Sequence, residues 1–267
     1  MITTLQYLIV GIIQGITEFL PISSSGHLLI AEHFFNIPQD LVLDTSLHLA
    51  TLLAVVLFYK NYLWQIITSF IADFAKHKAN LNNYSYDAKK GLYIIIATIP
   101  AAIAGFLFND FFESIRDLKI VIIMLFLISF YMALTLVVKH SATAKFNLKN
   151  IILIGLAQAL ALVPGTSRSG ITITTGMLLK ISKKDAADFS FLLSIPAILG
   201  AFALSVFKNP NFSQFTNINV VIAFIAAFIS GFFSIKLLLN ILQKQGFLPF
   251  IIYRIALALI LMLVIFT

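Results

Sequence analysis

Six apolar runs, each long enough to cross a lipid bilayer as a helix, dominate this sequence. They fall at residues 42–59, 92–108, 120–138, 187–207, 218–237 and 248–267. Hydrophobic residues make up 60% of the 267 residues and charged residues only 11%, against about 45–50% and about 25% in an ordinary soluble domain. The runs are continuous and do not alternate, which excludes a transmembrane β-barrel. We therefore predict an all-α polytopic membrane protein with one membrane domain over residues 1–267.

Two further apolar stretches, 2–35 and 150–180, are each interrupted near the middle by polar and helix-breaking residues. The interruptions are PISSSGH at 21–27 and PGTSRSG at 164–170. Irregular backbone is tolerated at membrane depth only where protein encloses it or where it lines a wet cavity. We therefore predict two re-entrant helix–loop–helix hairpins in addition to the six transmembrane helices.

The two interrupted stretches resemble each other at a constant offset. Residues of the first stretch recur 144 positions later: Gly11 as Gly155, Gln14 as Gln158, Gly26 as Gly170, and Asp44 as Asp188. Each half then consists of one hairpin followed by three spans, so the halves, 1–138 and 150–267, have opposite orientations. Such inverted-topology repeats place the functional site near the bilayer midplane, where the two interruptions meet.

The lysines predict the orientation in the membrane. Thirteen lie on one side, in the loops at 60–91, 139–149, 180–184 and 236–244, whereas Arg116, Lys119 and Lys208 lie on the other side. The positive-inside rule makes the lysine-rich side cytoplasmic, so the first hairpin opens outward and the second enters from the cytoplasm. These loops explain most of the net charge of +7, and we expect the lipid bilayer, not nucleic acid, as the partner.

Ionisable side chains at membrane depth predict a reaction site at the first interruption. Glu18 lies one turn from Gln14 on the same helix face, and His27 directly follows the serine run. The alternative for Glu18 is a helix-end carboxylate that extends to the membrane interface. For His27 the alternatives are a general acid or base, a nucleophile toward phosphorus, or a hydrogen-bonded core residue.

Both interruptions predict anion binding, because hydroxyls and free backbone N–H groups precede a short helix. The residues concerned are Ser23, Ser24, Ser25 and Gly26 in the first loop, and Thr166, Ser167, Ser169 and Gly170 in the second. The second loop adds Arg168, whose guanidinium suits bidentate phosphate recognition. The alternative, small residues that only allow tight helix packing, explains the glycines but not Arg168.

Several polar residues at the edges of spans are secondary candidates, which pairing with each other or with a helix end explains equally well. They are Asp44, His48, Asp188 and Arg254. Glu32 and His33 follow the first short helix, near the outer interface, and we expect them to be solvated.

The two motifs together, QGITEFLPISSSGH at 14–27 and PGTSRSG at 164–170, closely resemble the bacterial undecaprenyl-pyrophosphate phosphatases, also called bacitracin-resistance proteins. FSFLLSIP at 189–196 and the pair Tyr253 and Arg254 extend the resemblance over nearly the whole chain. It implies a hydrolase of the bacterial plasma membrane that converts undecaprenyl pyrophosphate to undecaprenyl phosphate. That product is the carrier lipid of cell-wall synthesis, and its recycling confers bacitracin resistance.

By motif position, the resemblance implies a role for each polar residue. Glu18 matches the essential carboxylate, Ser23 and Ser24 the loop hydroxyls, His27 the catalytic histidine and Arg168 the phosphate-binding arginine. Two assignments of the nucleophile stay open: Ser24 or a water attacks while His27 handles the proton, or His27 attacks directly.

The resemblance also implies a divalent cation, Mg²⁺ or Ca²⁺, held by Glu18 and the diphosphate oxygens. Gln14 stands where the family often has glutamate, so a mechanism with two carboxylates on the metal is in question here. The sequence leaves the oligomeric state open, including a homodimer.

A transporter is the competing class of function. Inverted repeats with re-entrant hairpins are typical of alternating-access carriers, so the same pocket can also suit a flippase of polyprenyl phosphate. The serine run beside His27 favours the enzyme, because a carrier has less use for that pair.

Overall fold

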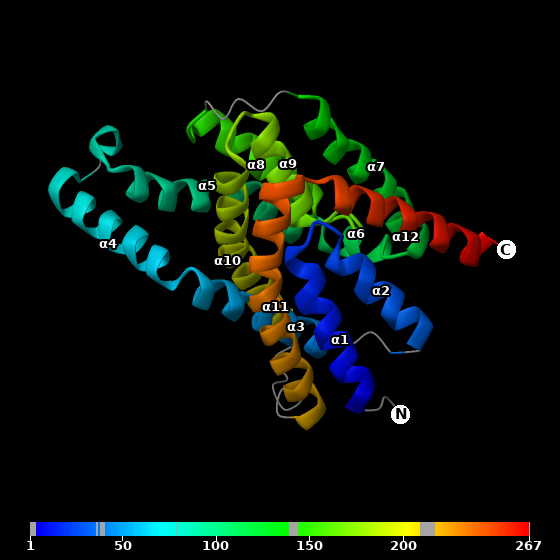
Figure 1. Cartoon of the computed structure of the whole chain (residues 1–267). Coiled ribbons are helices and arrows are strands. Elements are labelled where there is room, and N and C mark those ends of the chain that lie inside the picture. The colour runs from blue at the N-terminus through cyan, green and yellow to red at the C-terminus, as the bar shows by residue number, and fades with distance from the viewer. Residues whose placement is uncertain are drawn as a thin grey trace.

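The computed structural model describes residues 4–35, 37, 41–78, 80–138, 144–208 and 217–266. In these residues all regular structure is helical (Figure 1). The first half contains α1 (Thr4–Phe19), α2 (Ser24–Phe35), α3 (Leu41–Phe58), α4 (Lys60–His77), η1 (Leu81–Asn83), α5 (Tyr86–Leu107), α6 (Asn109–Ser114) and α7 (Leu118–Val137). The second half contains α8 (Leu148–Leu160), α9 (Arg168–Leu178), α10 (Lys183–Lys208), α11 (Ile218–Gln245) and α12 (Leu248–Phe266).

The helices confirm a polytopic membrane protein. Among the described residues, five helices are individually long and apolar enough to cross a bilayer: α5, α7, α10, α11 and α12. A sixth candidate is the pair α3 and α4, which pass the same test together and are bent by 74° at their junction. Each of the six apolar runs of the sequence thus overlaps one of these candidates.

Helix α4 corrects the prediction that 60–91 is a loop. Its large apolar residues Trp64, Ile67, Ile71 and Phe74 recur at intervals of three and four, and all four are exposed. This spacing is typical of an amphipathic helix, which average hydropathy does not detect. Figure 1 shows α4 and the start of α5 extending together away from the body formed by the other helices.

The two halves pack in matching ways. Helix α1 lies along α11, and α8 lies along α5. A Cβ on Gly11 would come within 2.3 Å of the Ala223 carbonyl oxygen, and one on Gly155 within 2.7 Å of the Ala97 carbonyl oxygen. Each hairpin therefore begins with a helix whose glycine allows direct backbone contact with a long apolar helix.

Each interruption contains a serine that caps the following helix. Ser23 and Ser167 have positive φ values of 76° and 75°, a conformation that is uncommon for residues other than glycine. Their hydroxyls accept the backbone N–H of Gly26 and Gly170, both at 3.2 Å. The first turns of α2 and α9 thus start in the same way, 144 residues apart.

The fully buried Arg254 of α12 joins the two interruptions. Its guanidinium donates to the carbonyl oxygens of Pro21 at 3.4 Å, Gly165 at 3.0 Å and Met124 at 3.1 Å, and to the Ser129 hydroxyl at 3.3 Å. Pro21 and Gly165 are also 144 residues apart. Arg254 therefore satisfies matching carbonyls of both interruptions. This agrees with the alternative in which Arg254, a secondary candidate, only satisfies a helix end.

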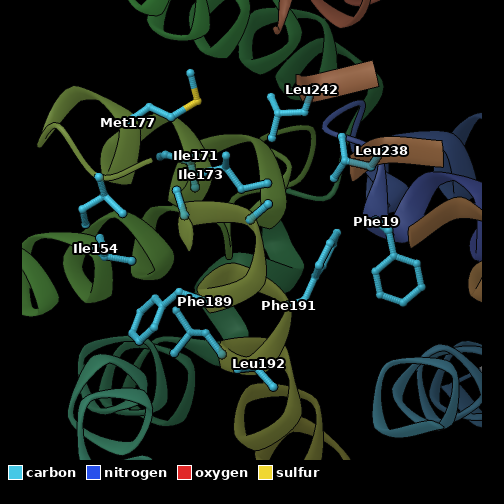
Figure 2. Close-up of a cluster of buried hydrophobic side chains, with 14 of the residues drawn as sticks. Phe19, Ile154, Ile171, Ile173, Met177, Phe189, Phe191, Leu192, Leu238 and Leu242 are labelled. Atoms are coloured by element: carbon cyan, nitrogen blue, oxygen red, sulfur yellow. The ribbon is translucent and has the colours of Figure 1, made fainter. Parts of the chain in front are cut away.

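The apolar core lies beside these loops. Figure 2 shows Phe19 and Phe191 within this cluster, and their rings meet edge to face with centroids 5.6 Å apart. Phe19 directly follows Glu18, and Phe191 follows Ser190. Both phenylalanines are fully buried. Their packing therefore holds in place the neighbouring backbone of α1 and α10, which carries Glu18 and Ser190.

Candidate active site

Glu18, at the end of α1, binds residues from both hairpins. Its Oε1 accepts from Arg168 Nη2 at 2.8 Å, and its Oε2 accepts from Ser24 Oγ at 2.7 Å and from Gln14 Nε2 at 3.0 Å. The side chain is only 7% exposed, so Glu18 does not extend to the membrane interface. The contact between Glu18 and Arg168 brings the end of α1 against the start of α9; that the functional site lies there stays a prediction.

Arg168 begins α9 and is held from two sides. Besides Glu18, it binds the Ser190 carbonyl oxygen through Nη1 at 3.1 Å. A guanidinium has five N–H donors in a planar fork, so these two contacts leave donors for an anion. Arg168 is thus oriented next to Ser24 by a carboxylate and a helix carbonyl.

His48 belongs to the site, although the sequence placed it only among the secondary candidates. Its Nδ1 lies 3.1 Å from Gln14 Nε2 and 3.6 Å from Glu18 Oε2. The signal in the sequence was a histidine within an apolar span. Nothing in the spacing placed that histidine beside Glu18, because the contact depends on how α3 packs against α1.

His27 faces Tyr253 of α12. Its Nδ1 donates to the Ser23 carbonyl oxygen at 2.7 Å, since a carbonyl can only accept, and its Nε2 lies 2.6 Å from the Tyr253 hydroxyl. The two rings are stacked with centroids 5.7 Å apart. In the described part of the chain no hydrogen bond joins His27 to Glu18 or Arg168, but Ser24 lies one turn away on the same face of α2.

The other loop hydroxyls hold the loops themselves. Ser25 Oγ accepts from the Gly165 backbone at 3.3 Å, and Ser169 Oγ donates to the Leu20 carbonyl at 3.3 Å, so these two serines connect the interruptions. Thr166 donates within its own loop, to the Val163 carbonyl at 2.7 Å. Contact of these hydroxyls with substrate stays a prediction.

The remaining secondary candidates form ion pairs away from the site. Arg116 pairs with Asp44 at 3.2 Å and with Glu32 at 2.5 Å, so Glu32, whose side chain is 11% exposed, is not the solvated residue predicted from the sequence. Asp188 accepts from the Tyr59 hydroxyl at 2.7 Å and lies 3.7 Å from Lys184.

The side chains of the site supply too few ligands to hold a cation by themselves, so a bound substrate would have to supply the others. Within the described ranges no three His, Cys, Asp or Glu residues gather as a metal site. However, Gln14 is fully buried, and its Oε1 has no hydrogen-bond partner. This oxygen and the Glu18 carboxylate are hard donors of the kind that Mg²⁺ and Ca²⁺ prefer.

The fold and the site define a polytopic helical membrane protein in which the buried Glu18 bonds the partly buried Arg168 and Ser24 between two helix–loop–helix segments. The chain belongs to the family described as bacitracin resistance protein BacA, whose model matches residues 7–260. It is 43% identical to an undecaprenyl-diphosphatase of Caldicellulosiruptor bescii over 262 residues, which cover 96% of this chain and 95% of the relative. Proteins of the same name from Methanobrevibacter smithii and Alteromonas mediterranea are each 38% identical, over 91% and 99% of this chain and 90% and 99% of their own length.

Proposed function

We propose that this chain is a membrane phosphatase that hydrolyses undecaprenyl diphosphate to undecaprenyl phosphate and inorganic phosphate. The observation that carries the proposal is the ion pair of the buried Glu18 with the partly buried Arg168, with Ser24 bonded to the same carboxylate. A partly buried arginine with spare donors suits the phosphoryl oxygens, and a serine bonded to a carboxylate suits nucleophilic attack. The name shared by the relatives, which match this chain over nearly their full length, supports the same substrate.

In this mechanism Ser24 Oγ attacks the terminal phosphorus, and its proton passes to Glu18 Oε2, which accepts the Ser24 hydrogen bond. The bond between that phosphorus and the bridging oxygen breaks, and undecaprenyl phosphate leaves with the oxygen. Arg168 stabilises charge on the phosphoryl oxygens in the transition state. Water then hydrolyses the phosphoserine: His27, one turn from Ser24 on α2, takes a proton from the water, and Glu18 returns its proton to Ser24 Oγ. Trapping the phosphoenzyme and mapping its residue distinguishes Ser24 from His27, and finding none assigns the attack to water.

We propose that a divalent cation, Mg²⁺ or Ca²⁺, is held by Glu18, by Gln14 Oε1 and by the substrate's diphosphate. When bound, such an ion neutralises negative charge on the phosphoryl oxygens. The partnerless buried oxygen of Gln14 supports this assignment.

The first test is phosphate release from undecaprenyl diphosphate by the purified protein in detergent, with and without EDTA. Release that EDTA abolishes and Mg²⁺ or Ca²⁺ restores is the expected result. A protein that binds the lipid but releases no phosphate would contradict the phosphatase and favour the alternative, a flippase of polyprenyl phosphate.

The architecture that we propose is a pair of inverted repeats, 1–138 and 150–267, with α1–α2 and α8–α9 as re-entrant hairpins. The matching capping serines, the matching glycine contacts of α1 and α8, and the position of Arg254 support this assignment. We also propose a homodimer, for which the exposed apolar stripe of α4 offers a surface. Light scattering of the protein–detergent complex tests the dimer.

We predict that the site opens to the outside of the bacterial plasma membrane, with the lysine-rich segments in the cytoplasm. The chain has no cysteine, so single cysteines can be labelled without background. Ser114→Cys, at the end of α6, is expected to react with a membrane-impermeant maleimide on intact cells. Asn82→Cys, in η1, is expected to react only after lysis. The reverse pattern would contradict this orientation.

Tyr253→Phe is predicted to lower kcat of phosphate release about tenfold with little change in KM. The substitution keeps the stacked ring but removes the hydroxyl that holds His27 Nε2, so the imidazole loses its fixed orientation next to Ser24. Tyr131→Phe is the matched control, because its hydroxyl bonds Thr175 on α9, away from Glu18. An unchanged kcat in Tyr253→Phe would show that the hydroxyl does not position His27.

A further inference from the structure

The Gln14 amide nitrogen lies between two acceptors that it shares. Gln14 Nε2 is 3.0 Å from Glu18 Oε2 and 3.1 Å from His48 Nδ1, and these two acceptors are 3.6 Å from each other. One hydrogen-bond donor thus sits where a carboxylate oxygen and an imidazole nitrogen converge from α1 and α3.

The His48 imidazole presents Nδ1 to this donor. Because Gln14 Nε2 can only donate, Nδ1 faces it with a lone pair in this arrangement. An imidazole lone pair directed toward a carboxylate is the geometry in which a histidine and a carboxylate share a metal ion. The Gln14 Oε1 on the other side of the amide is buried without a partner.

We infer that His48 Nδ1, Glu18 Oε2 and Gln14 Oε1 together form the protein's share of the cation site, with His48 as a metal ligand. A half-turn of the Gln14 amide exchanges its nitrogen and its oxygen. The oxygen then lies beside the Glu18 carboxylate and the His48 nitrogen, and the cation is the partner that all three share. The carboxylate oxygen keeps a second lone pair for Ser24. This inference rests on the cation of the proposed function and adds to it the histidine and the resulting metal preference.

An imidazole ligand changes which ions the site prefers. Ca²⁺ and Mg²⁺ favour all-oxygen coordination, whereas first-row transition ions such as Mn²⁺ accept a nitrogen ligand readily. We therefore expect Mn²⁺ to bind this protein at least roughly tenfold more tightly than Ca²⁺, since only Mn²⁺ gains from His48.

The test uses the full chain in detergent, purified through a tag without histidines and titrated with Mn²⁺ in the presence of methylene diphosphonate, a diphosphate that cannot be hydrolysed. Electron spin echo envelope modulation of the bound Mn²⁺ detects a directly coordinated ¹⁴N. The expected result is nitrogen modulation in the wild type that disappears in His48→Gln and in His48→Ala. His33→Gln, at an exposed histidine near the end of α2, is the matched control and is expected to retain the modulation.

Two results would overturn the inference: bound Mn²⁺ without nitrogen modulation in the wild type, or modulation that survives both His48 substitutions. Thermal unfolding of each variant checks that the fold is retained, and Ca²⁺ competition measures the metal preference. The phosphatase is judged separately from phosphate release in the same preparations. Metal-dependent release without nitrogen modulation supports the phosphatase and excludes His48 as a metal ligand. Nitrogen modulation without phosphate release supports His48 as a metal ligand and contradicts the phosphatase.

Discussion

Glu18→Gln is expected to reduce kcat of phosphate release by about a thousandfold or more. Glutamine has nearly the same shape but no negative charge, so it cannot accept the Ser24 proton or balance Arg168. Loss of a proton acceptor and of one electrostatic partner in a buried site each cost roughly two to three orders of magnitude in rate. The measurement is steady-state phosphate release from undecaprenyl diphosphate.

The matched control for Glu18→Gln is Glu113→Gln. Glu113 lies exposed on α6, where its carboxylate accepts from Asn109 Nδ2 at 2.6 Å, and it is outside the site. Its substitution is expected to leave kcat within about twofold, because an exposed polar contact contributes little. A Glu18→Gln protein that keeps its thermal stability and more than a tenth of the wild-type kcat would contradict the role assigned to Glu18.

Arg254→Met is expected to lower the free energy of unfolding by roughly 3–5 kcal/mol, because each buried carbonyl left without this donor costs about 1–3 kcal/mol. Methionine fills similar space, but three backbone carbonyls, those of Pro21, Gly165 and Met124, lose their donor inside the protein. Phosphate release is expected to fall as well, because Pro21 and Gly165 belong to the interruptions that hold Glu18 and Arg168 together.

Thermal and denaturant unfolding in detergent measure this effect. Lys236→Met on α11 is the control: it also removes a cation, but Lys236 is exposed and lies over the Phe232 ring, 4.9 Å from its centroid. We expect it to change stability by less than about 1 kcal/mol. Equal unfolding midpoints for Arg254→Met and the wild type would show that Arg254 does not hold the two interruptions.

The membrane-spanning helices and the central residues of the site could be predicted from the sequence. Long apolar runs become helices because a bilayer leaves backbone groups no other partner, and the structure places a helix over each run. Glu18, Ser24 and Arg168 stood out because charged and hydroxyl groups are rare among such runs, and the structure brings these three into direct contact. The sequence did not predict α4, because its apolar residues lie on one face and their average hydropathy is low.

The sequence alone determined which segments are apolar enough to cross a membrane and which polar residues interrupt two further apolar stretches, since both follow from local composition and spacing. Only the tertiary structure decided which of these side chains meet. His48 reaches Gln14 across 34 positions, Tyr253 reaches His27 across 226, and Arg254 reaches Pro21 across 233. Such contacts depend on how helices distant in the chain pack against each other, and hydropathy carries no information about that packing.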